Sequence, residues 1–513
     1  MKSGTGVRGA TWYTGLVGLA VGAMLTGLLV PFIEGERESA SSVATDGFAA
    51  GEDASGGFSD TGGGDTADGD PASDDAPVAT DGSGGAAPAT SSPGATTPTT
   101  VGPSSSAPLR ATDQGVTAST IKVAFLLLDL GQTGRVGVNT TGVTPKQQQA
   151  AIEAYVADIN GRGGINGRKI EPFFRVFDVT NPDDQRAACL AATEDAKAFA
   201  VVAMPGYAND ALLCVTEQHR TPLIATGQAV SREFYNRSQG RLVTLGMAGD
   251  RMMRNWVVEL DARGLVKGRT IGILSGDAKN ARDTIDGALV PALKASGHKV
   301  AHVTRLSSDQ ATAASQIPTE VQQMRTKGVD TVLLTGSFLN SVPWVQTADR
   351  QGWRPRYLQS EFSGGTSDFE TQGMPASFNG TLAMTGQRYG EWRSKGPEPE
   401  FEARCADLYE KRTGDPMPQN NGNDSNNGYP TTMFACGMLR VFEQVAAAAG
   451  PELTRTSFVG ALQKGLRGPG GFYFQGNFRM GKNDMVDMVR FNRYESACGC
   501  WRNVDQPRAV RFR

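Results

Sequence analysis

Histidine is scarce in this sequence, and its scarcity limits the chemistry that the chain can perform. The 513 residues contain three histidines, His219, His298 and His302, and none stands with cysteines or carboxylates at the spacing of a zinc site. A nucleophile elbow, a phosphate-binding loop and a histidine-containing acid/base cluster are also missing from the sequence. We therefore expect neither a metal centre nor an enzyme, and we predict no cofactor and no catalytic residue.

An excess of charge of either sign is lacking as well. The chain has 50 lysines and arginines against 53 aspartates and glutamates, which gives a formal net charge of −3. Such a balance creates no long-range field that would gather a polyanion. Nucleic acid is therefore not an expected partner.

Charged residues are absent from residues 9 to 33, where an apolar run extends from Trp12 to Phe32. The run is about long enough to cross a bilayer as a helix and longer than the core of a typical signal peptide. Lys2 and Arg8 precede it and glutamates follow it, so the positive-inside rule places the N-terminus in the cytoplasm.

We therefore expect a short cytoplasmic N-terminus (1–11) and a transmembrane signal anchor (12–33). The main domain would then lie at the outer face of the cell membrane or in the periplasm. The alternative is a cleaved signal peptide with its cleavage site near Ser42–Ala44. No cysteine follows the apolar run, which excludes lipid attachment through a cysteine at a cleavage point.

Residues 34–112 are rich in glycine, alanine, serine, threonine, aspartate and proline, and no lysine or arginine occurs between residue 39 and Arg110. Such a composition buries too little apolar surface to offset the entropy of ordering. We expect a disordered linker, and for about 75 residues the random-coil reach is on the order of 50 Å.

The character of the chain changes after residue 118. Ile121–Leu128 has the continuous apolar pattern of a strand covered on both faces, and Pro145–Asn160 has an apolar stripe at helical spacing. Strand and helix patterns then alternate, with further strands at Lys169–Phe177, Phe199–Ala203 and Pro222–Ala225. A second alternating block follows, and its strands are expected at Thr270–Ser275, Lys299–Arg305, Val329–Gly336 and Tyr357–Leu358. Alternation of this kind predicts two α/β lobes with parallel sheets, and a ligand is expected beyond the carboxyl ends of their strands.

The segment Ala157–Ile170, followed by Phe177-Asp178 and Asn181-Pro182, joins a glycine-ended helix to a strand and then to a proline turn. It resembles the type I periplasmic binding proteins of branched-chain amino acid and amide uptake, including the leucine/isoleucine/valine-binding proteins. The resemblance covers roughly residues 118–505. It implies two doubly wound parallel sheets joined by three hinge crossovers near residues 245, 386 and 470. Lobe 1 would comprise 118–245 and 387–469, and lobe 2 would comprise 246–386 and 470–505.

Ligand contacts in this family come from the turns that follow the sheet strands. In this chain the resemblance places them at Tyr207, Ala208, Asn209, Thr226, Gly227, Gln228, Asn280, Ser337, Phe338 and Glu361. Free N–H groups near Tyr207 would bind a ligand carboxylate at the start of a helix. Glu361 falls where the family carries the carboxylate that meets a ligand ammonium.

The even number of cysteines suits disulfides in an oxidising compartment. Cys189 and Cys214 lie in successive predicted helices flanking one strand, and we expect them to be bonded. Cys405 and Cys436 form a plausible second pair in two later helices of the same lobe. Cys498 and Cys500 are either a strained local disulfide or two partners for other cysteines.

Taken together, the resemblance implies a solute-binding protein that captures an amino acid or a related small amide and delivers it to the permease of an ABC transporter. The alternative is a membrane-tethered sensor that acts through a signalling partner.

Overall fold

The computed structural model describes residues 108–133, 144–227, 230–362, 364–368, 370–389, 400–414, 428–468, 470 and 472–512. All of them belong to one compact unit, Thr100–Arg513. The predicted anchor (12–33) and nearly all of the predicted linker lie outside these residues. Among the residues described, no helix is both long enough and apolar enough to cross a membrane.

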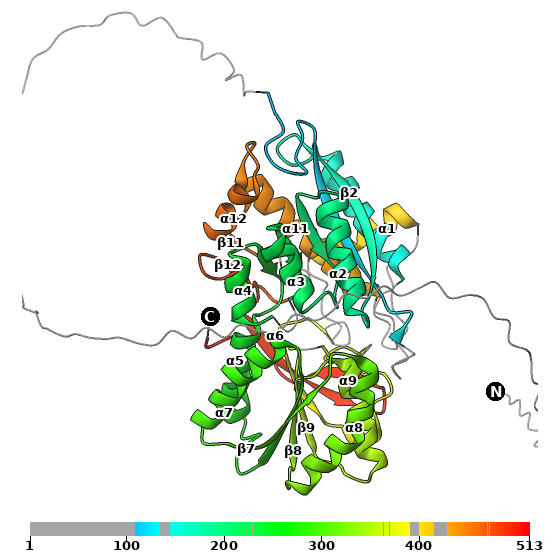
Figure 1. Cartoon of the computed structure of the whole chain (residues 1–513), viewed down its shortest axis with the longest axis vertical. Coiled ribbons are helices and arrows are strands. Elements are labelled where there is room, and N and C mark those ends of the chain that lie inside the picture. Colours follow the sequence, from blue (N-terminus) through cyan, green and yellow to red (C-terminus); the bar gives the residue numbers. More distant parts are fainter. Residues whose placement is uncertain are drawn as a thin grey trace, which may run out of the picture. The chain divides into compact units, whose positions relative to one another are not determined.

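The first sheet is wholly parallel and has the strand order β2-β1-β3-β4-β5. Its strands are β1 (Thr120–Asp129), β2 (Lys169–Asp178), β3 (Ala200–Ala203), β4 (Leu223–Ala225) and β5 (Leu242–Thr244). Strand β1 is buried along nearly its whole length, as its apolar pattern predicts. The accompanying helices are α1 (Pro145–Gly161), α2 (Pro182–Leu190), α3 (Asp210–Leu213) and α4 (Arg232–Ser238), and α2 and α3 continue as the π-helical turns η2 (Ala191–Asp195) and η3 (Cys214–Gln218). This sheet and its helices form lobe 1 (Figure 1).

Local chemistry explains both ends of the α1 segment. Thr144 caps the helix, and its side chain and that of Gln147 form a reciprocal capping box. The turn into β2 needs glycine at position 164, where φ is +75° and a Cβ atom would lie 2.1 Å from the Arg168 carbonyl oxygen.

The second sheet has the order β14-β13-β10-β9-β8-β6-β7, and β15 pairs with β13. Its strands are β6 (Thr270–Gly276), β7 (Lys299–Leu306), β8 (Thr331–Leu334), β9 (Arg356–Ser360), β10 (Leu382–Thr385), β13 (Met488–Glu495), β14 (Cys500–Asn503) and β15 (Arg508–Ala509). Strands β6 to β10 pair in parallel, whereas β13, β14 and β15 pair antiparallel. The predicted parallel pairing therefore holds for β6 to β10, whereas the edge formed by β13, β14 and β15 is antiparallel. A tight turn joins β13 to β14 and leaves no room for a crossover helix.

The helices of this second lobe are α5 (Gly249–Ala262), α6 (Lys279–Thr284), α7 (Val290–Ala295), α8 (Gln310–Thr326) and α9 (Phe338–Arg350). The π-helical turn η4 (Ile285–Leu289) separates α6 from α7. Helix α8 begins directly after Asp309, because the Asp309 side chain accepts a hydrogen bond from the Thr312 N–H and caps the helix.

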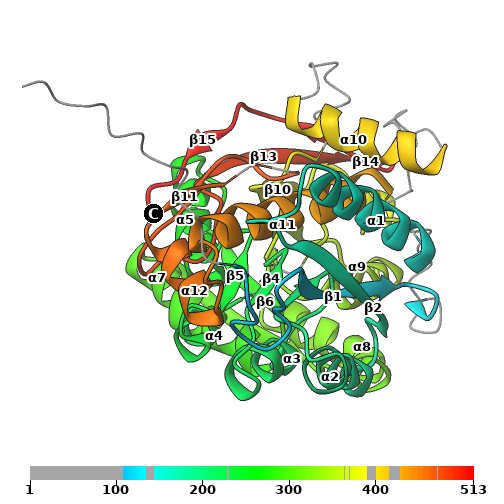
Figure 2. The same ribbon diagram turned by 90° about the horizontal axis from the view of Figure 1, so that it is seen from above.

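After β10 the chain returns to lobe 1 and adds α10 (Glu400–Thr413), α11 (Gly428–Ala449) and α12 (Arg455–Gln463). Figure 2 shows α10 and α11 beside α1, and these three helices pack on one another. The short strands β11 (Leu466–Arg467) and β12 (Asn477–Phe478) precede the return to the second sheet. Three connections therefore join the lobes, at residues 245–249, 385–389 and 472–487.

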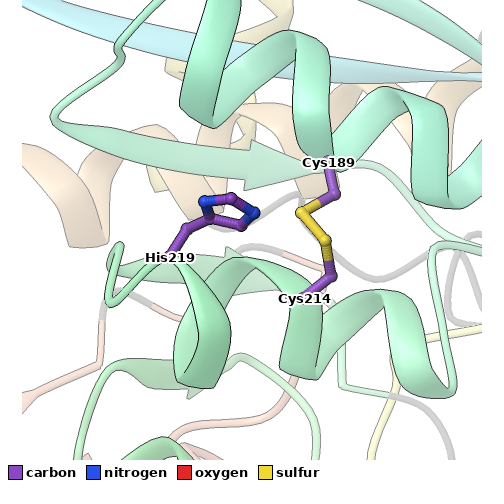
Figure 3. Close-up of side chains that lie close together, drawn as sticks. All are labelled: Cys189, Cys214 and His219. Carbon is purple, nitrogen blue, oxygen red and sulfur yellow. A yellow bond between two sulfur atoms is a disulfide. The ribbon is translucent and has the colours of Figure 1, made fainter.

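Three disulfides link the six cysteines. Cys189 bonds to Cys214 and Cys405 bonds to Cys436, which confirms both predicted pairs. Cys498 bonds to Cys500, so the local alternative is the one that the structure shows. His219 lies beside the Cys189–Cys214 bridge (Figure 3), but the two sulfur atoms are bonded to each other and offer no thiolate to a metal.

Candidate ligand-binding cleft

A cavity of about 200 Å³ lies where the carboxyl ends of both sheets converge. Lobe 1 lines it with the residues that follow β1, β2, β3 and β4, and lobe 2 lines it with those that follow β6, β7 and β8. Ligands of open α/β sheets bind at such carboxyl ends. The cavity, called the cleft below, is therefore the candidate site.

Most of the predicted contact residues line this cleft. They are Tyr207, Ala208, Asn209, Thr226, Gly227, Asn280, Ser337 and Phe338. Gln228 lies outside the described residues, and Glu361 is not part of the lining. The structure thus brings eight of the ten residues together, and their contact with a ligand stays a prediction.

Apolar side chains dominate the described lining. Leu128, Leu130 and Val179 come from the ends of β1 and β2, Leu212 comes from α3, and Phe338 faces them from the start of α9. The described residues of the lining include no lysine, arginine or histidine, and its two charged side chains are Asp277 and Glu370. The cleft thus suits a molecule with an apolar body.

The predicted carboxylate cradle is partly occupied by the protein itself. The Ala208 N–H donates to Gln185 Oε1 at 3.1 Å, and the Tyr207 N–H donates to the Met204 carbonyl oxygen at 3.4 Å. The Tyr207 hydroxyl donates to the Ala211 carbonyl oxygen at 3.3 Å, and its ring packs edge-on against Phe177. Burial raises the pKa of the Tyr207 hydroxyl. Tyr207 is held mainly by packing within lobe 1.

Asn280 forms a contact between the lobes. Its Oδ1 accepts a hydrogen bond of 2.6 Å from the Ser231 N–H, and the side chain is buried. Ser231 follows β4 in lobe 1, whereas Asn280 lies in α6 of lobe 2. The bond therefore holds the two lobes together beside the cleft.

Two buried polar side chains in the lining have no partner within the described part of the chain. Thr226 and Asn340 are each only 4% exposed, and neither the Thr226 hydroxyl nor the Asn340 side-chain amide makes a hydrogen bond there. Polar side chains that line a cavity and have no protein partner there are available to hydrogen-bond a ligand. The sequence prediction named Thr226 but did not single out Asn340 from the turn that follows β8. Asn340 stands in the first turn of the helix that follows β8, and this position was the signal in the sequence that could have identified it.

Glu361 lies at the end of β9 and is buried. Its Oε2 accepts hydrogen bonds from Thr385 Oγ1 at 2.6 Å and from the Gly386 N–H at 2.7 Å. Burial raises the pKa of Glu361 to about 7, although these hydrogen bonds act in the opposite direction. The carboxylate is therefore directed at the second connection between the lobes, away from the cleft.

Hydrogen bonds continue from this connection to the other two. The Gln387 N–H donates to Thr385 Oγ1 at 2.9 Å, and Gln387 Nε2 donates to the Tyr473 hydroxyl at 3.1 Å. The Tyr473 hydroxyl donates in turn to the Thr226 carbonyl oxygen at 2.9 Å, which also accepts the Gly246 N–H at 2.7 Å. This relay, called the hinge network below, joins all three connections to a residue of the cleft.

Buried charges reinforce the third connection. Arg251 of α5 pairs with Asp484 and, at 2.6 Å, with Asp487. The Lys482 amine donates to the Met485 carbonyl oxygen at 3.0 Å and lies 3.4 Å from the Asp487 carboxylate. Burial lowers the pKa of Lys482 to about 8. Removing one partner of such a buried set is strongly destabilising, which fixes the path of this segment.

Comparisons with known proteins agree with this architecture. A family described as periplasmic binding protein matches residues 120–493. No curated protein sequence matches the chain.

Three solved structures illustrate the shared fold. A fatty acid ABC transporter substrate-binding protein from Thermomonospora curvata is 18% identical, with a TM-score of 0.59 over 79% of this chain and 96% of that one. A solute-binding protein of an ABC transporter from R. palustris, in complex with 4-hydroxybenzoate, is 14% identical, with a TM-score of 0.58 over 76% and 98%. A branched-chain amino acid ABC transporter protein from Thermus thermophilus with bound valine is 16% identical, with a TM-score of 0.56 over 77% and 98%.

Proposed function

Because the chain belongs to the periplasmic binding protein family, we propose that it captures a small, predominantly apolar solute outside the cytoplasm. The cleft carries this proposal. Its lining comes from both lobes and is mostly apolar, and two unpaired polar side chains are available within it. Binding would bring the lobes together by hinge motion around the solute.

Delivery to the permease of an ABC transporter is part of the same proposal. The similar structures from Thermomonospora curvata and R. palustris are a fatty acid ABC transporter substrate-binding protein and an ABC transporter solute-binding protein in complex with 4-hydroxybenzoate. Both molecules combine an apolar body with a polar group. We propose the same general solute class for this cleft.

An amino acid or small amide is the narrower ligand that the sequence resemblance implies. Its support is weakened by the position of Glu361, whose carboxylate is bonded to the second connection. It is also weakened by the occupied N–H groups of Tyr207 and Ala208. Amino acids therefore enter the test as one of several solute classes.

The proposal also includes an attachment to the membrane by residues 12–33. The linker 34–112 would separate the two-lobed domain from the membrane. Full-length chain expressed in cells should partition with membranes, and a chain lacking residues 1–33 should not. Equal partitioning of the two chains would contradict the anchor.

A thermal unfolding screen tests the binding function. The full-length chain in mild detergent would be heated with fatty acids, aromatic acids, amines, alcohols, amides and amino acids. A solute at one hundred times its dissociation constant should add about 2.7 kcal/mol to the free energy of unfolding. Phe338→Ala should abolish the shift, whereas Met480→Ala, at a residue that is 79% exposed and outside the cleft, should preserve it. No shift with any class would contradict solute binding.

A further inference from the structure

The charges of the cleft point to a more specific ligand. Asp277 and Glu370 are the charged side chains of the described lining. Glu370 is committed to the protein, because its Oε2 accepts hydrogen bonds from the Gly365 N–H at 2.8 Å and from Ser367 Oγ at 2.9 Å. It caps the turn that contains these donors and has a structural role.

Asp277 differs from Glu370 in having an available oxygen. It directly follows β6, and its Oδ1 accepts the Ser308 N–H at 2.8 Å. Its Oδ2 has no hydrogen bond within the described residues, and the carboxylate forms no ion pair there. Arg282 is nearby, but it donates to the Asp277 backbone carbonyl oxygen rather than to the carboxylate. Among the described residues, the half-buried Asp277 carboxylate at the cleft therefore has no ion-pair partner.

A carboxylate ligand finds no matching positive group in the described lining. The N–H groups of Tyr207 and Ala208 already donate to protein acceptors. Thr226 and Asn340 can offer neutral donors, but these would have to offset repulsion by the Asp277 charge. Like charges brought together in a partly desolvated site repel each other strongly. The lining therefore disfavours anions.

The unpaired side chains of Thr226 and Asn340 specify a second feature. Thr226 follows β4 in lobe 1, and Asn340 lies in the first turn of α9 in lobe 2. Neither side chain makes a hydrogen bond within the described residues, so a ligand that supplies a donor or an acceptor can form one with each of them. A polar group on the ligand would thus bond to both lobes.

We propose that the cleft selects an apolar solute that carries a protonated amine, with Asp277 as the ion-pair partner and with Asn340 and Thr226 as hydrogen-bond partners. This inference rests on the proposed solute-binding function and narrows its ligand class. Asp277 and Asn340 become the specificity-determining residues. Both lie in turns that follow strands, where the sequence predicts ligand contacts, but neither was named individually.

Two solute series with a constant apolar body test the proposal. One comprises 3-methylbutylamine, 3-methylbutanol, 4-methylpentanoate and leucine, and the other comprises 2-phenylethylamine, 2-phenylethanol, 3-phenylpropanoate and phenylalanine. Affinities would be measured by calorimetry on the full-length chain in mild detergent. In at least one series the amine should bind at least tenfold more tightly than its alcohol, carboxylate and amino acid.

Variants then test whether Asp277 and Asn340 cause the preference for the amine. Asp277→Asn keeps an acceptor for the Ser308 N–H and should weaken the amine at least tenfold while changing the alcohol little. Asn340→Ala should weaken amine and alcohol alike, by threefold to tenfold. Asp407→Asn, which removes an exposed carboxylate of α10 outside the cleft, should have no effect.

Four results overturn the inference. Tighter binding of a carboxylate or an amino acid than of its matched amine would do so, and so would an amine affinity that is unchanged in Asp277→Asn. If only solutes outside both series bind, the amine preference fails while the solute-binding function stands. If no solute of any class binds, the proposed function itself is overturned, and this inference falls with it.

Discussion

The protonation of Glu361 is coupled to the stability of the folded chain. Burial raises its pKa from the ordinary value of 4.5 to about 7. Between about pH 4.5 and pH 7 the folded chain therefore holds a proton that the unfolded chain has released. The contribution of this residue to the free energy of unfolding falls as the pH rises through this window, and the loss is complete above pH 7.

Glu361→Gln removes this titration. Relative to the unmodified chain, the variant should gain about 1 to 3 kcal/mol in free energy of unfolding between pH 4.5 and pH 7.5. Urea denaturation of both chains at the two pH values measures the difference. The surface substitution Glu452→Gln controls for the loss of a glutamate. A difference that does not vary with pH would show that Glu361 is not held in this protonation state.

Single residues also show what sequence reasoning can reach in the cleft. Thr226 and Phe338 could be predicted because each stands just after a strand whose carboxyl end faces the ligand site. Glu361 stands at an equivalent position, yet its carboxylate is turned away by Thr385 and Gly386. Those donors come from a connection 24 and 25 residues further along, so no local pattern indicates the orientation.

At the scale of elements, the Cys189–Cys214 bridge closes a longer loop than the Cys498–Cys500 bridge. The sequence separations are 25 and 2 residues. Because a cross-link restricts the unfolded chain more when its loop is longer, replacing the first pair by alanines should cost about 3 kcal/mol and replacing the second about 1.5 kcal/mol. Urea denaturation under oxidising conditions measures both losses. Equal losses would contradict the loop-length argument.

Elements with a strong period could be predicted, and elements built from long-range contacts could not. Strand β1 is buried on both faces and α1 carries a continuous apolar stripe, so each has an unambiguous pattern. The stretch between β6 and β7 is less regular and forms α6, η4 and α7 in succession. The antiparallel strands β14 and β15 depend on pairing with β13, and their own sequences are too short to carry a period.

At the scale of the whole molecule, the hinge network links the cleft to the three connections between the lobes. It does so through segments that are distant in the sequence. Thr226, Gln387 and Tyr473 are brought together only by the fold. The positions of the hinge crossovers near residues 245, 386 and 470 follow from the family resemblance. The hydrogen bonds between the connections do not, because they require side chains from three separate segments.

Tyr473 is the central member of this network and gives a prediction about hinge motion. Tyr473→Phe removes one hydroxyl that donates to the Thr226 carbonyl oxygen and accepts from Gln387. Tyr155→Phe is a matched control, because the buried Tyr155 hydroxyl donates to the Cys405 carbonyl oxygen within lobe 1. Each substitution should lower the free energy of unfolding by about 1 kcal/mol.

Only Tyr473→Phe should change the distribution of distances between the two lobes. With one spin label on α1 and one on α8, the distance distribution of the solute-free chain should broaden in Tyr473→Phe and stay unchanged in Tyr155→Phe. The reason is that the Tyr473 hydroxyl ties the second and third connections to a cleft residue of lobe 1, so its loss releases the hinge while the core of each lobe keeps its packing. Identical distributions in the two variants would mean that the hydroxyl contributes to stability alone, and that closure of the lobes is governed by the Asn280 to Ser231 contact and the Arg251 ion pairs.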